Sequence, residues 1–254
     1  MKQFTAADGI TIVYDEWGQP SDRPPVLLHH GFIADAHLNW VLPGVVDALV
    51  AADRHVVGLD ARGHGRSDKP HDPALYGEAT MARDLRTLMD ILGAAEVDLV
   101  GYSMGAIVAL IVASVEPRIR RLVVGGVGAG VVELGGVDTR VLDNNALVAA
   151  LETDDPSSIT DPGAAAFRGF ADMGGSDRLA LAAQARVVHA SPIPLDRIIA
   201  PTLLLTGDAD SLAARPHVLA EAIPGAEWRG LTGDHAGALG DPHFTAALID
   251  FLAA

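Results

Sequence analysis

Residues 97–116, VDLVGYSMGAIVALIVASVE, decide the fold of this chain. The apolar run 97–100 predicts a buried strand, and the Ala-, Ile- and Val-rich run 106–115 predicts a buried helix. Between them lies the pentapeptide GYSMG at 101–105, a G-x-S-x-G turn. A turn this tight between strand and helix holds its serine in a strained backbone conformation, with the hydroxyl exposed near the positive end of the helix. We therefore interpret Ser103 as a candidate nucleophile.

The composition predicts one large α/β domain. The 254 residues are 49% apolar and 20% charged, which is enough to bury a full core. No run approaches the roughly 18 apolar residues of a membrane helix, and the N-terminal MKQFTAADGI has no apolar signal region. The absence of cysteine excludes disulfides, thiolate zinc sites and a thiol nucleophile. We expect a cytoplasmic enzyme that is not exported and has no membrane partner.

The charge balance is strongly acidic. Eighteen basic residues against 33 acidic residues give a formal net charge of −15. Such a surface repels phosphate backbones and anionic lipid, so we expect no nucleic-acid partner. The acidic residues are scattered, which is typical of a solvated surface rather than an acidic interaction tail.

Strand and helix patterns alternate along most of the chain. An Asp8-Gly9 turn between 4–7 and 10–17 predicts an antiparallel hairpin. Further strands are expected at 26–30, 55–59, 97–100, 121–124, 203–205 and 227–231, and helices at 42–52, 77–92, 106–115, 212–223 and 244–252. This alternation indicates an α/β protein with a doubly wound, mostly parallel sheet. Reactive groups in such sheets lie in loops at the carboxyl ends of strands, where Ser103 is expected.

Residues 131–199 break this alternation. Two or three short helices, around 138–151, 162–173 and 176–190, are separated by prolines and by Gly174-Gly175. An insertion at this place, after the sixth strand, would lie over the strand ends. We therefore expect a small helical cap at 131–199 on an α/β core formed by residues 1–130 and 200–254. The alternative is an ordinary pair of helices packed on the sheet, because helix periodicity does not separate the two.

A serine nucleophile needs a base, and the base needs an orienting acid. His235 is the best base among ten histidines, because its loop, TGDHAG at 232–237, directly follows the last predicted strand. Asp208 and Asp210 both follow the strand 203–205, and their spacing does not choose between them. The order serine, acid, histidine is typical of nucleophile-elbow enzymes.

Two backbone N–H groups are expected to form an oxyanion hole. One belongs to Met104, directly after the serine, and the other to Phe32, in the loop after the strand that ends at His30. The neighbouring Gly31 suggests a backbone role for His30. The chain has no zinc-ligand spacing and no Gly-x-Gly-x-x-Gly loop, so we expect neither a metal nor a cofactor.

Together these motifs resemble the α/β-hydrolase superfamily of esterases, lipases and C–C hydrolases. The resemblance covers nearly the whole chain and rests on HGF at 30–32, DARGHGRS at 60–67, GYSMG at 101–105, GDAD at 207–210 and GDH at 233–235. It implies that Asp210 is the acid, with Asp208 in reserve. Some relatives carry the acid after the preceding strand, but VVGGV at 123–127 has no carboxylate there. The resemblance also implies structural roles for Arg62 and His64.

We therefore hypothesise acyl transfer through a covalent ester on Ser103, with His235 as base, Asp210 orienting it, and the amides of Phe32 and Met104 holding the oxyanion. The expected substrate is a small to medium carboxylic ester whose acyl group lies in an apolar pocket under the cap. The cap residues that could line this pocket are Leu142, Leu147, Leu151, Phe167, Phe170 and Met173, although core packing is the favoured role for each one individually.

The motifs leave the substrate and the exact reaction open. The same triad serves C–C bond hydrolysis of a vinylogous diketone, lactone hydrolysis and cofactor-free perhydrolysis. A small-molecule receptor on a hydrolase fold is a candidate from a different class, and an inactive homologue is disfavoured by the complete set of residues. Haloalkane dehalogenases and epoxide hydrolases of the superfamily carry aspartate at the elbow, which Ser103 excludes. The oligomeric state is not predicted.

Overall fold

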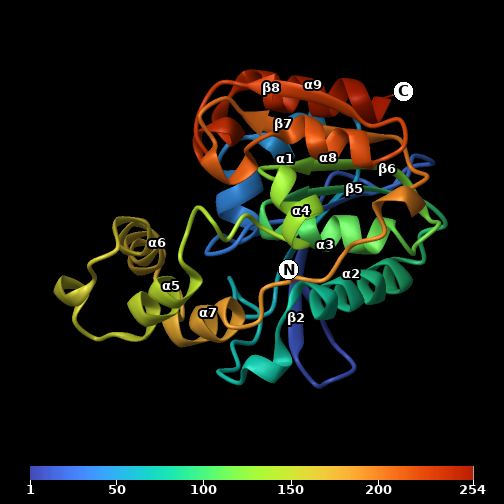
Figure 1. Ribbon diagram of the computed structural model, residues 1–254. Helices are drawn as coiled ribbons and strands as arrows, with labels where there is room; N and C mark the ends of the chain where they lie inside the picture. The colour runs from blue at the N-terminus through green and yellow to red at the C-terminus, as the bar shows by residue number, and fades with distance from the viewer. Residues whose placement is uncertain (254) are drawn as a thin grey trace.

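The computed structural model describes residues 1–253, which form one eight-stranded sheet with helices on both faces (Figure 1). The strand order is β1-β2-β4-β3-β5-β6-β7-β8. The strands span Lys2–Thr5 (β1), Thr11–Trp17 (β2), Val26–His29 (β3), Val56–Asp60 (β4), Val97–Tyr102 (β5), Ile119–Gly125 (β6), Thr202–Gly207 (β7) and Glu227–Leu231 (β8). The pairs β1–β2 and β2–β4 are antiparallel and all other neighbours are parallel. This confirms the doubly wound, mostly parallel sheet.

Two helical layers cover the sheet. On one face lie α1 (Val45–Ala51) and α9 (Pro242–Ala253), and on the other lie α2 (Glu78–Leu92), α3 (Met104–Ala113) and α8 (Pro216–Ala222). Helix α3 packs between the sheet and α2, so its side chains are apolar on all sides. Every helix within residues 1–253 is too short or too polar to cross a lipid bilayer.

A helical cap is inserted between β6 and β7. It contains α4 (Ala129–Leu134), α5 (Asn144–Glu152), α6 (Pro162–Met173) and α7 (Arg178–Ala185), and α5 to α7 extend beyond one edge of the core in Figure 1. Helices α5, α6 and α7 share a hydrophobic cluster of their own, formed by Leu147, Val148, Leu151, Ala171, Leu181, Ala182 and Ala185. The insertion after the sixth strand is thereby confirmed, while its boundaries at residues 131 and 199 stay a prediction.

Several helix boundaries differ from the expected ones because of capping. Helix α5 begins at Asn144 rather than 138, since the carboxylate of Asp143 accepts the N–H groups of Asn145 and Ala146 and fixes the helix start. Similarly, α1 begins after Gly44, whose φ of 82° lies in the left-handed region. Helix α4 was not predicted, because its glycine-rich sequence has no helical periodicity.

Candidate active site

Ser103 occupies a strained turn between β5 and α3. Its backbone φ is +55° and its N–H donates a 2.8 Å hydrogen bond to the carbonyl oxygen of Gly125. Glycine is required on both sides of the serine. A Cβ at Gly105 would overlap the carbonyl oxygen of His29, and one at Gly101 would overlap that of Gly105. The G-x-S-x-G spacing thus allows strand, turn and helix to pack close enough to present the Ser103 hydroxyl.

A chain of hydrogen bonds joins Ser103, His235 and Asp210. The Nε2 atom of His235 lies 2.9 Å from the hydroxyl oxygen of Ser103, and its Nδ1 atom lies 2.8 Å from Oδ2 of Asp210. The other carboxylate oxygen of Asp210 accepts the N–H groups of Leu212 and Ala213, which fixes the side chain. Because a carboxylate only accepts, Nδ1 carries the proton and Nε2 is left to accept the serine proton.

The second candidate acid, Asp208, lies in the same loop but does not reach the histidine ring. Its carboxylate accepts the N–H of Gly233 at 2.9 Å, and its own N–H donates to the carbonyl oxygen of Leu231. Asp208 therefore ties the loop after β7 to the loop that carries His235. The structure brings Asp210 to the imidazole, a distinction that spacing alone did not make.

The two residues whose amides are expected to form an oxyanion hole, Phe32 and Met104, belong to the wall of the cavity that contains Ser103. Neither backbone N–H donates a hydrogen bond to any of residues 1–253. A Cβ at Gly31 would lie 3.2 Å from that of Ser103, so the loop passes close to the hydroxyl. The side chain of Asn39 accepts the N–H of Gly31 at 2.6 Å and fixes the loop. Sequence analysis missed Asn39.

Three buried histidines, His29, His30 and His64, pack together next to the loop that contains Gly31. His30 donates from Nδ1 to the carbonyl oxygen of Gly31 at 2.7 Å, and its Nε2 accepts the N–H of Ala61 at 2.9 Å. The rings of His29 and His64 lie 5.7 Å and 5.2 Å from the His30 ring. Burial lowers the pKa of His29 to about 3 and of His64 to about 4, and it also lowers the pKa of His30. All three rings are therefore neutral near pH 7.

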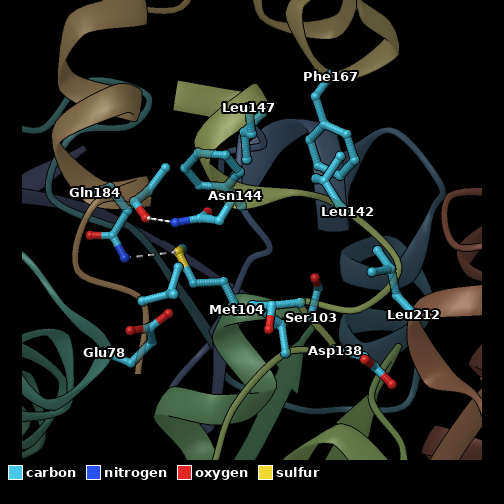
Figure 2. Close-up of a pocket in the computed structure, with 15 residues that line it drawn as sticks. Glu78, Ser103, Met104, Asp138, Leu142, Asn144, Leu147, Phe167, Gln184 and Leu212 are labelled. Carbon is cyan, nitrogen blue, oxygen red and sulfur yellow. Dashed lines mark hydrogen bonds between the residues drawn. The ribbon is translucent and has the colours of Figure 1, made fainter. Parts of the chain in front are cut away.

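A small apolar cavity of about 70 Å³ opens beside Ser103 (Figure 2). Its walls come from both the core and the cap. They comprise Phe32, Glu78, Ser103, Met104, Val137, Asp138, Thr139, Leu142, Asn144, Leu147, Phe167, Gln184, Ala185, Val188 and Leu212. The cap thus covers the serine and provides most of the surface that a bound molecule would contact.

The expected pocket residues divide into two groups. Leu142, Leu147 and Phe167 line the cavity, and in Figure 2 all three project toward it from the cap. The other three do not line the cavity, and the alternative role in core packing holds for Leu151. Leu151 is fully buried in the cap's own hydrophobic cluster, whereas Phe170 and Met173 lie on the outer surface of α6 and are 56% and 80% exposed. Helical periodicity does not distinguish the inner face of a cap helix from its outer face.

The remaining motif residues lie outside the cavity wall. Arg62 is buried and forms ion pairs with Asp8 and Asp84, which tie the N-terminal hairpin to α2. His64 donates from Nδ1 to the carbonyl oxygen of Arg62. Within residues 1–253, no group of three or more His, Asp or Glu side chains is arranged to hold a metal ion.

Comparisons with known proteins agree with this architecture. Residues 24–128 match the family described as "alpha/beta hydrolase fold". A hydrolase from Pseudomonas aeruginosa PA01 superposes with a TM-score of 0.80 at 27% identity, over 100% of this chain and 98% of that one. The enol-lactonase from Burkholderia xenovorans LB400 superposes with a TM-score of 0.83 at 23% identity, over 100% of both chains, and shows the same fold.

Among curated proteins, a non-heme chloroperoxidase from Streptomyces lividans is 37% identical over 123 residues, 46% of this chain. The match spans only 41% of the chloroperoxidase. Sequence similarity of this kind therefore covers less than half of the relative's length, whereas structural similarity extends over the whole chain.

Proposed function

This chain belongs to the α/β-hydrolase fold superfamily, and on that premise we propose that it is a serine hydrolase of small to medium carboxylic esters. One observation carries the proposal. A serine in a strained elbow, an imidazole and a carboxylate are joined by hydrogen bonds of 2.9 Å and 2.8 Å beside an apolar cavity. Nucleophile, base and orienting acid within hydrogen-bond reach are the requirements for acyl transfer.

In the proposed acylation, the Ser103 oxygen attacks the ester carbonyl carbon while Nε2 of His235 takes the hydroxyl proton. The tetrahedral intermediate collapses when the ester C–O bond breaks, and the leaving alcohol takes the proton back from His235. The carboxylate of Asp210 accepts a hydrogen bond from Nδ1–H throughout and stabilises the transient imidazolium.

Negative charge develops on the former carbonyl oxygen during attack. The N–H groups of Phe32 and Met104 are free of other partners within residues 1–253, and both residues line the cavity that contains Ser103. They are the proposed donors to the oxyanion, and losing one such donor typically costs about 3 kcal/mol of transition-state stabilisation. The Asn39 bond to Gly31 keeps the loop in place for this role.

Deacylation repeats the sequence with water. His235 takes a proton from the attacking water, the new C–O bond forms, and the acyl C–O bond to Ser103 breaks as the serine regains its proton. The apolar cavity beneath the cap accommodates the acyl chain, with Leu142, Leu147 and Phe167 as its proposed contacts.

A second candidate is lactone hydrolysis, because the same hydrogen-bonded serine, histidine and aspartate can attack a cyclic ester. A lactone is an internal ester, so the same triad would open it with the alcohol remaining on the acyl group. C–C bond hydrolysis, perhydrolysis and ligand capture without turnover remain the further alternatives on this site. The cytoplasmic location expected from the sequence also stays a prediction.

The test is steady-state hydrolysis of p-nitrophenyl esters from acetate to decanoate by the wild type and by Ser103→Ala. The variant should lose on the order of 10³- to 10⁶-fold in kcat. The acyl-chain length that gives the highest kcat/KM in the wild type measures the length of the acyl pocket. Undiminished turnover in Ser103→Ala would refute the assignment of Ser103 as the nucleophile. Absence of ester turnover in the wild type would refute ester hydrolysis. Lactones and vinylogous diketones, assayed in parallel, would then test the alternative reactions.

A further inference from the structure

Two residues with buried polar side chains, Glu78 and Gln184, line the cavity where core and cap meet. Glu78, the first residue of α2, and Gln184, from α7, are only 3% and 1% exposed. Figure 2 shows both side chains next to Met104, which follows the serine in the chain. The surface of the whole cavity is almost entirely apolar. A buried ionisable group in such a setting requires an explanation, because its charge is costly to bury.

The carboxyl of Glu78 has little internal compensation. Its Oε2 atom accepts the backbone N–H of His189 at 2.8 Å, and the backbone N–H of Glu78 itself also favours the ionised carboxyl. No cationic side chain contributes to its electrostatics, and burial raises its pKa to about 7. The other oxygen, Oε1, accepts no hydrogen bond from another residue within residues 1–253. The group therefore keeps hydrogen-bonding capacity for a molecule in the cavity.

The side-chain amide of Gln184 provides a hydrogen-bond donor in addition to the acceptor oxygen of Glu78. Its Oε1 atom accepts the N–H of Gly77 at 3.3 Å, which fixes the orientation of the amide. Its Nε2 atom contacts only the thioether sulfur of Met104, at 3.9 Å, and sulfur is a weak acceptor. A residue with an N–H donor and a residue with a carboxyl thus line the same apolar cavity from two elements, one in the core and one in the cap.

We propose that Glu78 and Gln184 form a binding subsite for a hydroxyl group on the acyl chain of the ester substrate. This inference rests on the proposed ester hydrolysis and names the class of substrate for that site. The enzyme would thus prefer esters of hydroxy acids to esters of unsubstituted alkanoic acids of the same length.

A hydroxyl group fits this subsite better than a charged group. It donates to the Glu78 carboxylate or accepts from the protonated carboxyl, and it accepts from Gln184 in both cases. An ammonium group would need an ionised Glu78, and a carboxylate would need a protonated one. Either ion would also have to leave water for an almost entirely apolar cavity, which is unfavourable.

The bond to His189 does not by itself require an acid at position 78. A glutamine there would accept the same N–H through its amide oxygen, without the cost of a buried carboxyl. The comparison of Glu78→Gln with Glu78→Leu therefore separates hydrogen bonding from charge, and Gln184→Leu tests the second partner independently.

The experiment measures hydrolysis of ethyl esters by pH-stat titration. Each ω-hydroxy ester, from hydroxybutanoate to hydroxyoctanoate, is paired with the alkanoate in which a methyl group replaces the hydroxyl. At the matching chain length we expect the wild type to prefer the hydroxy ester by on the order of tenfold or more in kcat/KM. Glu78→Gln should keep a preference, whereas Glu78→Leu and Gln184→Leu should lose or reverse it while still cleaving the alkanoate. Glu152→Gln, at a partly exposed ion pair with Arg186, is the control substitution.

The outcomes distinguish the two proposals. Equal kcat/KM for hydroxy and alkanoyl esters at every length in the wild type overturns the subsite alone, because hydrolysis itself persists. A preference that survives in both leucine variants, each shown to be folded by circular dichroism, also overturns it. In a second arm, hydroxyethyl butanoate is compared with propyl butanoate. A preference confined to that arm would place the alcohol, not the acyl chain, in the cavity and refute the assignment.

Discussion

The hydroxyl of Tyr102 donates a 2.7 Å hydrogen bond to the backbone carbonyl oxygen of His235. Their ring centroids lie 5.4 Å apart, and the tyrosine ring also packs edge-on against Phe244 of α9. The residue that precedes the candidate nucleophile thus holds the backbone of the candidate base. The last residue of β5 and the loop after β8 are positioned relative to each other by a direct contact.

Removal of the hydrogen bond from Tyr102 should make the position of His235 less fixed while the imidazole stays in the site. Tyr102→Phe retains the ring packing but loses the hydrogen bond to His235, so we expect a loss of about 1 kcal/mol in the free energy of unfolding. We also expect kcat to fall on the order of tenfold, because the imidazole is held less well. Urea unfolding and ester hydrolysis measure the two effects. An unchanged kcat would show that the loop holds His235 without Tyr102.

The two aspartates of the loop after β7 should differ strongly on substitution. Asp210→Asn removes the carboxylate that fixes the His235 tautomer, and we expect kcat to fall on the order of 10⁴-fold. Asp208→Asn keeps an oxygen that accepts the N–H of Gly233, so a loss below about tenfold is expected. Steady-state kinetics of the matched pair checks this. A larger loss in Asp208→Asn would reverse the assignment of the acid.

The buried histidines should make the protein sensitive to acid. The pKa of His64 is lowered from 6.5 to about 4, so the unfolded chain binds a proton that the folded protein resists. Stability is therefore lost as the pH falls from about 6.5 towards 4, and His64→Phe should lose less over this range. The difference between the two proteins should approach about 3 kcal/mol in the free energy of unfolding. His217→Gln, an exposed histidine, is the control, and identical slopes in all three proteins would contradict this account.

Glu78 should have the opposite pH dependence. Its pKa is raised from 4.5 to about 7, so the folded protein binds a proton that the unfolded chain releases. Stability therefore decreases as the pH rises from about 4.5 to 7, with a total cost of about 3 kcal/mol above that range. Glu78→Gln removes this cost and should gain stability relative to the wild type at pH 8 but not at pH 4. Urea denaturation at both pH values measures the difference, and a constant difference would exclude titration of Glu78.

The elements that sequence predicts well are those with local signals. Around Ser103, the flanking glycines cannot be replaced, because any side chain there would overlap the backbone. In the Asp8-Gly9 turn, the positive φ of Gly9 likewise favours glycine. The start of α5 was misplaced because capping by Asp143 depends on one side-chain rotamer rather than on periodicity. The choice between Asp208 and Asp210 likewise depends on the direction of two side chains in one short loop.

The residues missed in the sequence had no local signal. Asn39 reaches Gly31 from a separate helical turn, a contact that depends on the path of the loop. Glu78 resembles the acidic residues that commonly begin helices in solvent, and Gln184 follows a run of alanines with no motif. Their burial results from the way the cap folds back on α2, which is a tertiary effect that periodicity does not encode.

The cap has its own hydrophobic cluster, while Ser103, Asp210 and His235 all belong to loops of the sheet. Substitutions in the cavity wall between residues 137 and 188 therefore leave the hydrogen bonds of the serine, histidine and aspartate in place. During evolution, and equally in directed evolution, one contiguous stretch of this gene can change which molecules are accepted while the reacting groups stay under separate selection.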